Sequence, residues 1–178
     1  MLGAREIMYL SNEEIKELVK EKGLISDNFV ESNLTPNGYD MTIGSMTFDR
    51  RFIYIETAEE FNIPNDVVGT IFLRSTFARM GLVGTFGAVD AGYKGKLSLT
   101  LLNSDGLLSC NYISRVSKTH GATGATVETT TKEGYCKKGD MVLQKGTRIA
   151  QILFSKMSKE TSAPYNGKYQ KKTATQEQ

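Results

Sequence analysis

Four short segments of the chain combine glycines with side chains that can bind phosphate or transfer protons. Residues 37–44 (NGYDMTIG) contain one carboxylate, Asp40, and residues 73–82 (LRSTFARMGL) contain two arginines beside two hydroxyls. Residues 87–95 (GAVDAGYKG) read as a tight hairpin, and residues 164–170 (PYNGKYQ) combine two tyrosines with a lysine and amides. Hydroxyls and free backbone amides at a helix N-terminus bind phosphate oxygens, and arginine adds positive charge. The second segment therefore suits a phosphate group.

Each segment also has an ordinary structural explanation. Asp40 can cap a turn, and Arg74 and Arg79 can form surface ion pairs. Asp90 suits a hairpin turn, and the tyrosines of the last segment can be isolated contacts. Taken singly, these explanations are the simpler ones. The order of the four segments along the chain is what favours a function.

The rare residues exclude several kinds of catalytic site. His120 is the single histidine of the chain, so a Ser-His-Asp triad or a histidine-rich zinc site would depend on that residue alone. Cys110 and Cys136 belong to no Cys-x-x-Cys pair, which excludes a zinc-dependent deaminase. Neither a P-loop nor a Gly-x-Gly-x-x-Gly turn is present. The chemistry left to this chain uses carboxylates, hydroxyls, arginine, lysine and backbone amides.

Length and charge predict one folded domain, 1–178, without an extended charged surface. The chain has 178 residues, of which 39% are hydrophobic, so it can bury a core. Its 22 Lys and Arg against 20 Asp and Glu give a formal charge of +2, which argues against nucleic acid or a membrane as a partner. No apolar run reaches the length of about 18 residues that spans a membrane, and the start lacks the pattern of a signal peptide. We therefore expect a soluble, cytoplasmic protein.

The elements that must position these segments are mainly strands. One helix is signalled near the start, where Ser11 and Glu14 form a capping box and Gly23 suits the C-terminal cap. Short β-rich runs separated by turn residues follow, for example residues 97–102 (LSLTLL), in which alternate leucines indicate a strand buried on one face. A mainly β sandwich or barrel with a helix at one end is the expected architecture.

Two regions differ in composition from the rest. Residues 104–140 are rich in Ser, Thr, Gly and Lys and are expected to form a surface insertion, with a hairpin through 111–116 and 125–131. Its two cysteines could face each other across the hairpin, but two free thiols are the favoured interpretation. Residues 155–178 are basic and polar, and we expect a mobile C-terminal tail over about 160–178.

The order of the motifs resembles the dUTPase/dCTP deaminase superfamily, in particular its archaeal-type dCTP deaminase-like branch. The resemblance runs from residue 37 to residue 170, outside the insertion, and adds residues 63–69 (IPNDVVG) and 148–154 (RIAQILF) to the segments above. It implies a distorted, jelly-roll-like β-barrel (the dUTPase-like β-clip). It also implies a homotrimer with active sites between subunits that the C-terminal tail closes.

Within this superfamily the resemblance separates two reactions. Deaminases of this branch use a Glu on the strand after the third motif, and that position is Thr100 here. A threonine hydroxyl cannot replace a carboxylate in general acid–base catalysis. The carboxylate that activates water in dUTPases is present as Asp90, and Tyr93 matches the ring that excludes a 2′-hydroxyl in those enzymes. The resemblance therefore implies hydrolysis of dUTP to dUMP and pyrophosphate, with Mg²⁺ held mainly by the substrate phosphates and water, and Asp40 as a candidate in the second shell.

The resemblance also implies roles for the other site residues. Arg74 would hold the region of Asp90, and Arg79 would reach across the trimer interface. The residues expected to contact the nucleotide are Ser75, Thr76, Arg79, Gly87, Tyr93, Ser98, Leu99, Thr100, Gln151, Tyr165, Lys168, Tyr169 and Gln170. The tail departs from the family pattern at Lys171 and Lys172. The alternatives are a dCTP deaminase, a bifunctional enzyme, and a nucleotide-binding regulatory protein without catalysis.

Overall fold

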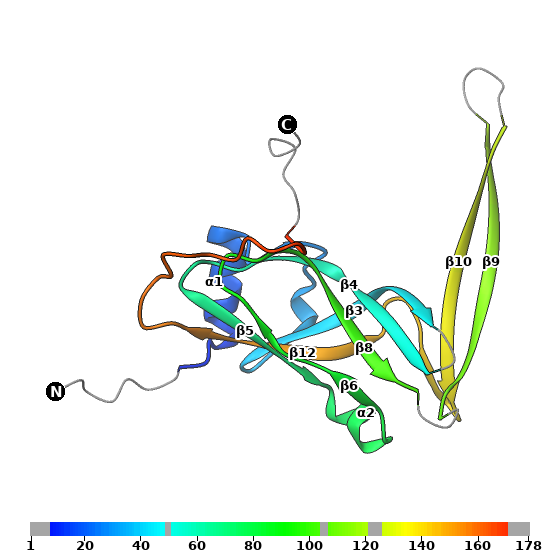
Figure 1. Cartoon of the computed structure of the whole chain (residues 1–178), viewed down its shortest axis with the longest axis horizontal. Helices are drawn as coiled ribbons and strands as arrows, with labels where there is room; N and C mark the ends of the chain where they lie inside the picture. Colours follow the sequence, from blue (N-terminus) through cyan, green and yellow to red (C-terminus); the bar gives the residue numbers. More distant parts are fainter. Residues whose placement is uncertain (1–7, 49–50, 104–106, 121–125, 171–178) are drawn as a thin grey trace.

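The computed structural model describes residues 8–48, 51–103, 107–120 and 126–170, and between 112 and 133 it describes the backbone alone. The chain is mainly β, as predicted, with one helix at the N-terminal end (Figure 1). In chain order the elements are α1 (Asn12–Lys22), β1 (Ile25–Asp27), the 3-10 turn η1 (Glu31–Asn33), β2 (Leu34–Thr35), β3 (Gly38–Phe48), β4 (Phe52–Asn62), β5 (Val67–Leu73), α2 (Ser75–Arg79), β6 (Val83–Thr85), β7 (Ala88–Val89), β8 (Lys94–Leu102), β9 (Ser109–His120), β10 (Thr126–Lys138), β11 (Met141–Leu143) and β12 (Arg148–Lys156).

A curled antiparallel sheet forms the body of the molecule. Its main path is β6-β8-β4-β3-β12-β5-β7, with β1 added beside β4 and β2 beside β3. Strand β3 pairs with β12 along its first half and with β4 along its second half, and the register shifts between Ile43 and Ser45. A Cβ atom on Gly44, at this shift, would lie 2.7 Å from the carbonyl oxygen of Thr57, so only glycine permits the strands to approach here. The sheet thus curls into the barrel type that the sequence predicted.

The core lies inside this curl and is built from alternate residues of the strands. Leu97, Leu99 and Leu101 of β8 are buried, which confirms the alternation predicted for this segment. They pack in one cluster with inward residues of β4, such as Ile53 and Ile55. Because adjacent side chains of a strand point to opposite faces, the intervening residues of β8 face away from this cluster.

Helix α1 begins and ends as the sequence predicted. Ser11 and Glu14 form the capping box, and Gly23 takes the left-handed cap conformation with φ +63°. Ile15 and Leu18 are buried against the core. The two caps therefore determine where the helix begins and ends, and the buried residues determine which of its faces packs against the core.

The insertion contains the predicted hairpin, longer than expected. Strands β9 and β10 pair with each other and with β11 in a sheet separate from the body, and they extend away from it (Figure 1). The prediction of two free thiols is wrong, because Cys110 and Cys136 form a disulfide. The two cysteines are directly opposite in the register of the hairpin, which brings their side chains together. Residues 104–106 and 121–125 lie outside the described residues.

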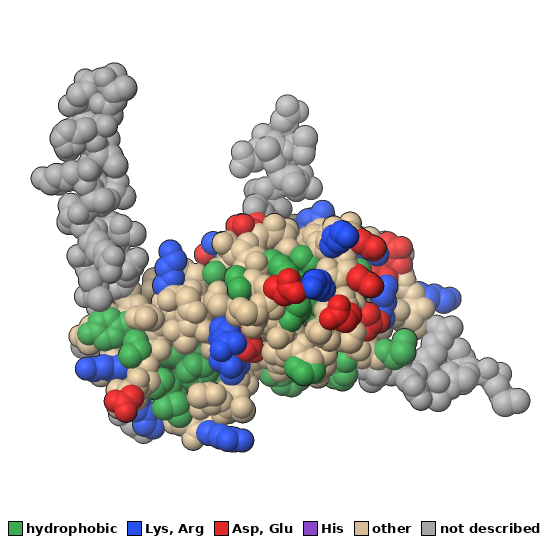
Figure 2. Space-filling model, turned by 180° about the vertical axis from the view of Figure 1, so that it is seen from behind, with side chains coloured by type: hydrophobic (Ala, Val, Ile, Leu, Met, Phe, Trp, Pro, Cys, Tyr) green, Lys and Arg blue, Asp and Glu red, His purple; other side chains and the backbone are tan. Residues whose placement is uncertain are grey.

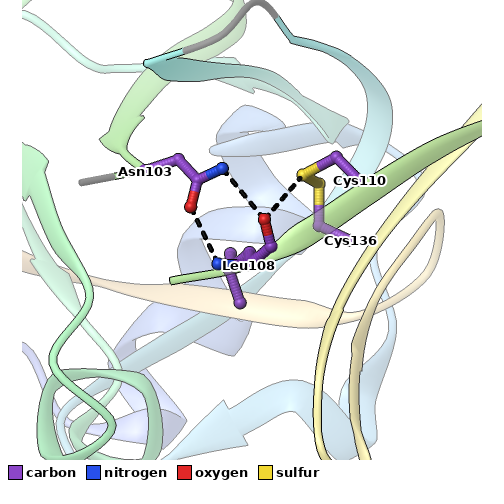
Figure 3. Close-up of a disulfide and its surroundings, with 4 residues drawn as sticks. All are labelled: Asn103, Leu108, Cys110 and Cys136. Atoms are coloured by element: carbon purple, nitrogen blue, oxygen red, sulfur yellow. Dashed lines mark hydrogen bonds between the residues drawn. A yellow bond between two sulfur atoms is a disulfide. The ribbon is translucent and has the colours of Figure 1, made fainter. Parts of the chain in front are cut away.

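Asn103 ties the root of the hairpin to the body, and the disulfide cross-links β9 to β10 at the same root. The Asn103 side chain donates to the carbonyl oxygen of Leu108 at 3.1 Å and accepts from its backbone N–H at 2.8 Å (Figure 3). Leu108 and Cys136 are buried in the main hydrophobic cluster. The root therefore belongs to the folded body, whereas the arm beyond it does not.

The C-terminal segment differs from the free tail expected from its composition. After β12 the chain continues along the body through Gln170, held by backbone hydrogen bonds such as Met157 N–H to Asp66 O at 2.8 Å and Thr161 N–H to Asn65 O at 3.0 Å. Composition could not indicate this, because these bonds use backbone groups that every residue carries. Residues 171–178, with Lys171 and Lys172, lie outside the described residues.

Charged side chains of both signs are interspersed on the face shown in Figure 2. This arrangement agrees with the nearly balanced composition of the chain. Among the described residues, no helix is long and apolar enough to cross a membrane.

Candidate functional site

A pocket of about 470 Å³ lies between the 87–93 segment, strand β8 and the C-terminal segment. Its wall is apolar at Ile71, Phe86 and Leu97, and polar side chains such as Asp90 and Ser98 also line it. The residues predicted from the sequence that the structure brings together here are Gly87, Asp90, Tyr93, Ser98, Leu99, Tyr165 and Tyr169. An apolar pocket with a few converging polar groups is the usual form of a small-molecule site.

A four-residue turn positions Asp90 and Tyr93. The Tyr93 N–H donates to the carbonyl oxygen of Asp90 at 3.1 Å, and Gly92 inside the turn has φ +86°, which favours glycine. Ile63 fixes the turn from outside, because its backbone accepts from Gly92 N–H at 3.0 Å and donates to Tyr93 O at 2.9 Å. Val89, the preceding residue, is buried, whereas the Asp90 carboxylate is exposed at the pocket.

Tyr93 is held by its hydroxyl and by its neighbour. The hydroxyl donates to the carbonyl oxygen of Lys96, and the ring meets Tyr165 edge to face with 5.5 Å between centroids. Burial raises the pKa of Tyr93, and the neighbouring Tyr165 adds to this effect. The phenol is therefore neutral at physiological pH, and the ring is a fixed wall of the pocket.

Strand β8 supplies the opposite wall. Ser98 and Leu99 line the pocket, whereas Thr100 lies beside it, between Tyr54 on β4 and Thr85 on β6 in the strand register. Thr100 is half-buried. The structure thus places Thr100, which the resemblance predicts to stand in for a deaminase Glu, next to the pocket.

The phosphate-binding residues expected from the sequence are gathered elsewhere on this chain. Ser75, Thr76 and Arg79 are exposed on the short helix α2, as the expected junction between strand and helix requires. Figure 1 shows α2 at the bottom of the body, whereas the C-terminal segment crosses its top. Gln151 is also outside the pocket and donates to Thr35 Oγ1 at 2.6 Å.

Asp40 and Arg74 form an ion cluster with Arg148. Arg74 Nε lies 3.0 Å and Arg148 Nη1 lies 3.6 Å from the same oxygen of Asp40, and Arg74 also donates to the carbonyl oxygen of Arg148 at 3.2 Å. Burial raises the pKa of Asp40, although both guanidiniums act to lower it. Within one chain Arg74 therefore contacts Asp40 and not Asp90, which corrects the expected contact.

The ion cluster of Asp40, Arg74 and Arg148 also affects whether Asp40 can help to hold the expected Mg²⁺. A carboxylate paired with two guanidiniums is poorly suited to a cation, so Asp40 does not fit the second-shell role within this chain. Among the residues that the structure describes, no group of three His, Cys, Asp or Glu side chains could hold a metal ion. Asp90 alone at the pocket fits an ion whose other ligands come from phosphate and water.

Comparison with known proteins finds relatives with two related activities. The family model for dCTP deaminase-like proteins matches residues 46–107, which include the turn of Asp90 and strand β8. A dCTP deaminase of Thermococcus sibiricus is 28% identical over 84% of this chain and 86% of its own length. A probable deoxyuridine 5′-triphosphate nucleotidohydrolase of Sulfolobus islandicus rod-shaped virus 1 is 25% identical over 92% of this chain and 94% of its own length. The chain is thus similar to dCTP deaminases and to a probable dUTPase over most of its length.

A solved structure agrees with this similarity at the level of the fold. The dCTP deaminase of Agrobacterium tumefaciens matches with a TM-score of 0.54 and 15% sequence identity. The match covers 85% of this chain and 49% of that chain, so the present chain corresponds to about half of it. The β-clip type of barrel expected from the sequence is therefore the fold of this chain.

The sequence did not predict the contacts of two polar residues, Arg148 and Glu59. Arg148 lies in one of the family motifs, but its ion pair with Asp40 depends on the pairing of β3 with β12 and cannot be read from the sequence. Glu59 is fully buried on β4, where Thr42 donates to it from its backbone at 3.0 Å and from its hydroxyl at 2.8 Å. Its signal was available, because Glu59 is in phase with the buried positions Ile53 and Ile55 of a period-two strand.

Proposed function

We propose that this protein is a dUTP diphosphatase, which hydrolyses dUTP to dUMP and pyrophosphate. Two residues support the proposal: Asp90, which lines the pocket, and Thr100, which lies beside it. Asp90 offers a carboxylate to the pocket, and the resemblance predicts that Thr100 occupies the position where a deaminase needs its Glu. A carboxylate can take a proton from water at neutral pH, and a threonine hydroxyl cannot exchange one with the amino group of cytosine.

The proposed reaction needs one proton acceptor. Asp90 accepts a proton from a water molecule, whose oxygen bonds to the α-phosphorus as the bond to the bridging oxygen breaks and pyrophosphate leaves. The exposed carboxylate at the pocket edge supports this role, because water reaches it directly. When bound to the triphosphate, Mg²⁺ would neutralise phosphate charge, and its ligands would be phosphate oxygens and water.

The remaining pocket residues support recognition of the nucleoside. The Tyr93 ring is fixed by its hydroxyl and by Tyr165, so it can exclude a 2′-hydroxyl by contact. Backbone groups around Gly87 and along Ser98 and Leu99 line the same space and can read the edge of the pyrimidine. These contacts would select a deoxynucleotide over a ribonucleotide.

In this proposal, the residues that bind the triphosphate come from a second subunit. Ser75, Thr76 and Arg79 are exposed on α2, away from the pocket of their own chain. A homotrimer that sets α2 of one chain beside Asp90 of another would complete each site. The same symmetry gives each of the three chains identical surroundings.

One steady-state assay tests the proposal. Purified protein with Mg²⁺ is given dUTP, dCTP or UTP, and release of pyrophosphate and of ammonia is measured for each. We expect pyrophosphate from dUTP, little from UTP and no ammonia from dCTP. Absence of pyrophosphate from dUTP would reject the proposal, and nucleotide binding without turnover would favour a regulatory protein.

A dCTP deaminase is the second candidate, and the names of relatives favour it. The Thermococcus sibiricus relative is a dCTP deaminase, and the matching family model is dCTP deaminase-like. The assay above separates the two reactions by ammonia. Ammonia from dCTP at a rate comparable to dUTP hydrolysis would indicate a bifunctional enzyme with a proton carrier other than residue 100.

A further inference from the structure

Two asparagines of the chain, Asn37 and Asn166, are followed by glycine, and the structure gives them different surroundings. Asparagine is a thermolabile residue. A following glycine increases its reactivity, because without a Cβ atom the glycine nitrogen can approach the asparagine side chain closely. Whether such a pair reacts in the folded protein depends on how firmly the surrounding structure holds its backbone.

The pair Asn37-Gly38 is held in a hairpin. Gly38 is the first residue of β3 and lies opposite Thr35 of β2 in the strand register. It is buried, and a Cβ atom placed on it would lie 2.6 Å from the carbonyl oxygen of Ile152. Strand pairing and packing therefore fix the backbone that follows Asn37, and a reaction there requires the hairpin to open.

The pair Asn166-Gly167 belongs to no helix or strand, and both of its residues are exposed. The Gly167 carbonyl oxygen accepts from the Gln170 N–H at 3.1 Å. Within the part of the chain that the structure describes, the Asn166 side chain and the Gly167 N–H form no hydrogen bond. Neither of the two groups that would react with each other is therefore held by another partner.

The glycine at position 167 has a structural reason. A Cβ atom on Gly167 would lie 2.5 Å from the hydroxyl oxygen of Tyr165 and 2.6 Å from its Cζ atom. The Tyr165 ring is itself in contact with Tyr93, edge to face. A larger residue at position 167 would displace this ring, so the packing that favours glycine here also keeps the reactive sequence.

We propose that Asn166 is a modification site, at which the folded protein spontaneously loses ammonia and gains a carboxylate. The Gly167 nitrogen bonds to Cγ of Asn166, the bond from Cγ to Nδ2 breaks, and the N–H proton leaves with Nδ2 as ammonia. Water then opens the resulting succinimide ring at one of its two carbonyl carbons. One opening gives aspartate, and the other gives isoaspartate, in which the backbone runs through Cγ and is one bond longer.

Isoaspartate lengthens the chain between two points that are fixed to the body. Before Asn166, the Tyr165 N–H donates to the carbonyl oxygen of Ala91 at 2.8 Å. After it, the Gln170 side chain, which the sequence predicted to contact the nucleotide, accepts from the Lys94 N–H at 2.9 Å. An additional backbone bond between these points changes their separation, so the contact of Gln170 with Lys94 is weakened.

Peptide mapping of aged protein tests the site. The full chain is kept in neutral buffer at physiological temperature, and the modified fractions at Asn166 and Asn37 are followed by mass spectrometry against an unaged sample. In the folded protein Asn166 should react at least about tenfold faster than Asn37, since the hairpin must open first. In guanidinium chloride both pairs should react at similar rates, because the hairpin that protects Asn37 is then unfolded.

The variant Asn166→Gln is the matched control. Its longer side chain would have to close a larger ring, so position 166 should stay unmodified while Asn37 keeps its own rate. Equal rates at Asn37 and Asn166 in the folded parent would overturn the inference. A rate at Asn166 far below its rate in guanidinium chloride would overturn it as well, because the fold would then protect this pair too.

Hydrogen exchange tests the consequence for the segment, and neither readout requires nucleotide hydrolysis. The isoaspartate form is separated by its additional negative charge, and exchange of the Lys94 N–H should be several-fold faster than in unmodified protein. Asn166→Asp carries the charge on a backbone of normal length, so its Lys94 exchange should stay near that of the parent. Unchanged exchange in the isoaspartate form would contradict the weakened contact of Gln170.

Discussion

At the scale of single residues, the proposed chemistry depends on Asp90. Asp90→Asn keeps the shape of the side chain but cannot accept a proton, so we expect kcat for dUTP to fall about 10²–10⁴-fold. Asp140→Asn, in the exposed turn between β10 and β11, is the matched control and should leave kcat unchanged. Activity of Asp90→Asn within about threefold of the parent would contradict the assignment of the base.

A second single residue, Tyr93, is expected to determine the selectivity for dUTP over UTP. Tyr93→Ala removes the fixed ring and should reduce the ratio of kcat/KM for dUTP over UTP. Tyr93→Phe keeps the ring and loses the bond to Lys96 O, so it should keep most of this ratio. The ratio is measured with both nucleotides under identical conditions, and an unchanged ratio in Tyr93→Ala would reduce the ring to a packing role.

At the scale of elements, the disulfide cross-links the two strands of the hairpin at its root. Its cysteines are 26 positions apart, and a loop of that length is worth about 3–4 kcal/mol of unfolding free energy in the chain-entropy model. Reduction should therefore lower the melting temperature by several degrees or more. The variant with Cys110→Ala and Cys136→Ala is the control, because it should melt at one temperature with or without reductant. A parent that melts identically in both conditions would contradict a stabilising disulfide.

The hairpin arm beyond the disulfide is a separate element. Its removal tests whether it contributes to catalysis. Leu108 and Cys136 are in the core, so the replacement must spare them. Residues 113–132 can be exchanged for a short glycine-containing turn, and we expect kcat for dUTP to stay within about twofold of the parent. Loss of kcat in a protein that keeps its oligomeric state by light scattering would make the arm part of the active site.

At the scale of the whole molecule, the buried Glu59 affects the pH dependence of stability. Burial raises its pKa above the ordinary value of 4.5, so between that value and the raised one the folded chain binds more protons than the unfolded chain. The contribution of this group to stability is therefore present below pH 4.5 and is lost as the pH rises through the raised pKa.

Glu59→Gln removes this titration and keeps the size of the side chain. We expect the variant to gain free energy of unfolding relative to the parent as the pH rises from about 4 to about 8. Denaturant unfolding at several pH values measures the difference, with exposed Glu17→Gln on α1 as the matched control. A difference that does not change with pH would show that Glu59 titrates alike in the folded and unfolded chain.

The sequence by itself determined the elements whose signals are local. The capping box of Ser11 and Glu14, the alternation of Leu97 and Leu99, and the glycine turn after Asp90 all depend on neighbours within a few positions. Each restricts backbone or side-chain conformation without help from distant parts of the chain. For the same reason the family motifs could be recognised in order.

The tertiary structure alone decided the contacts between distant segments. Asp40 finds Arg74 and Arg148 only when β3, β5 and β12 share one sheet. Pairing of the two cysteines required the register of a hairpin whose length the sequence did not give. The C-terminal segment looked like a free tail because its bonds, from Tyr165 N–H and the Gln170 amide to the turn of Gly92, join partners more than 70 positions apart. Such contacts depend on how elements pack, and no local pattern encodes that packing.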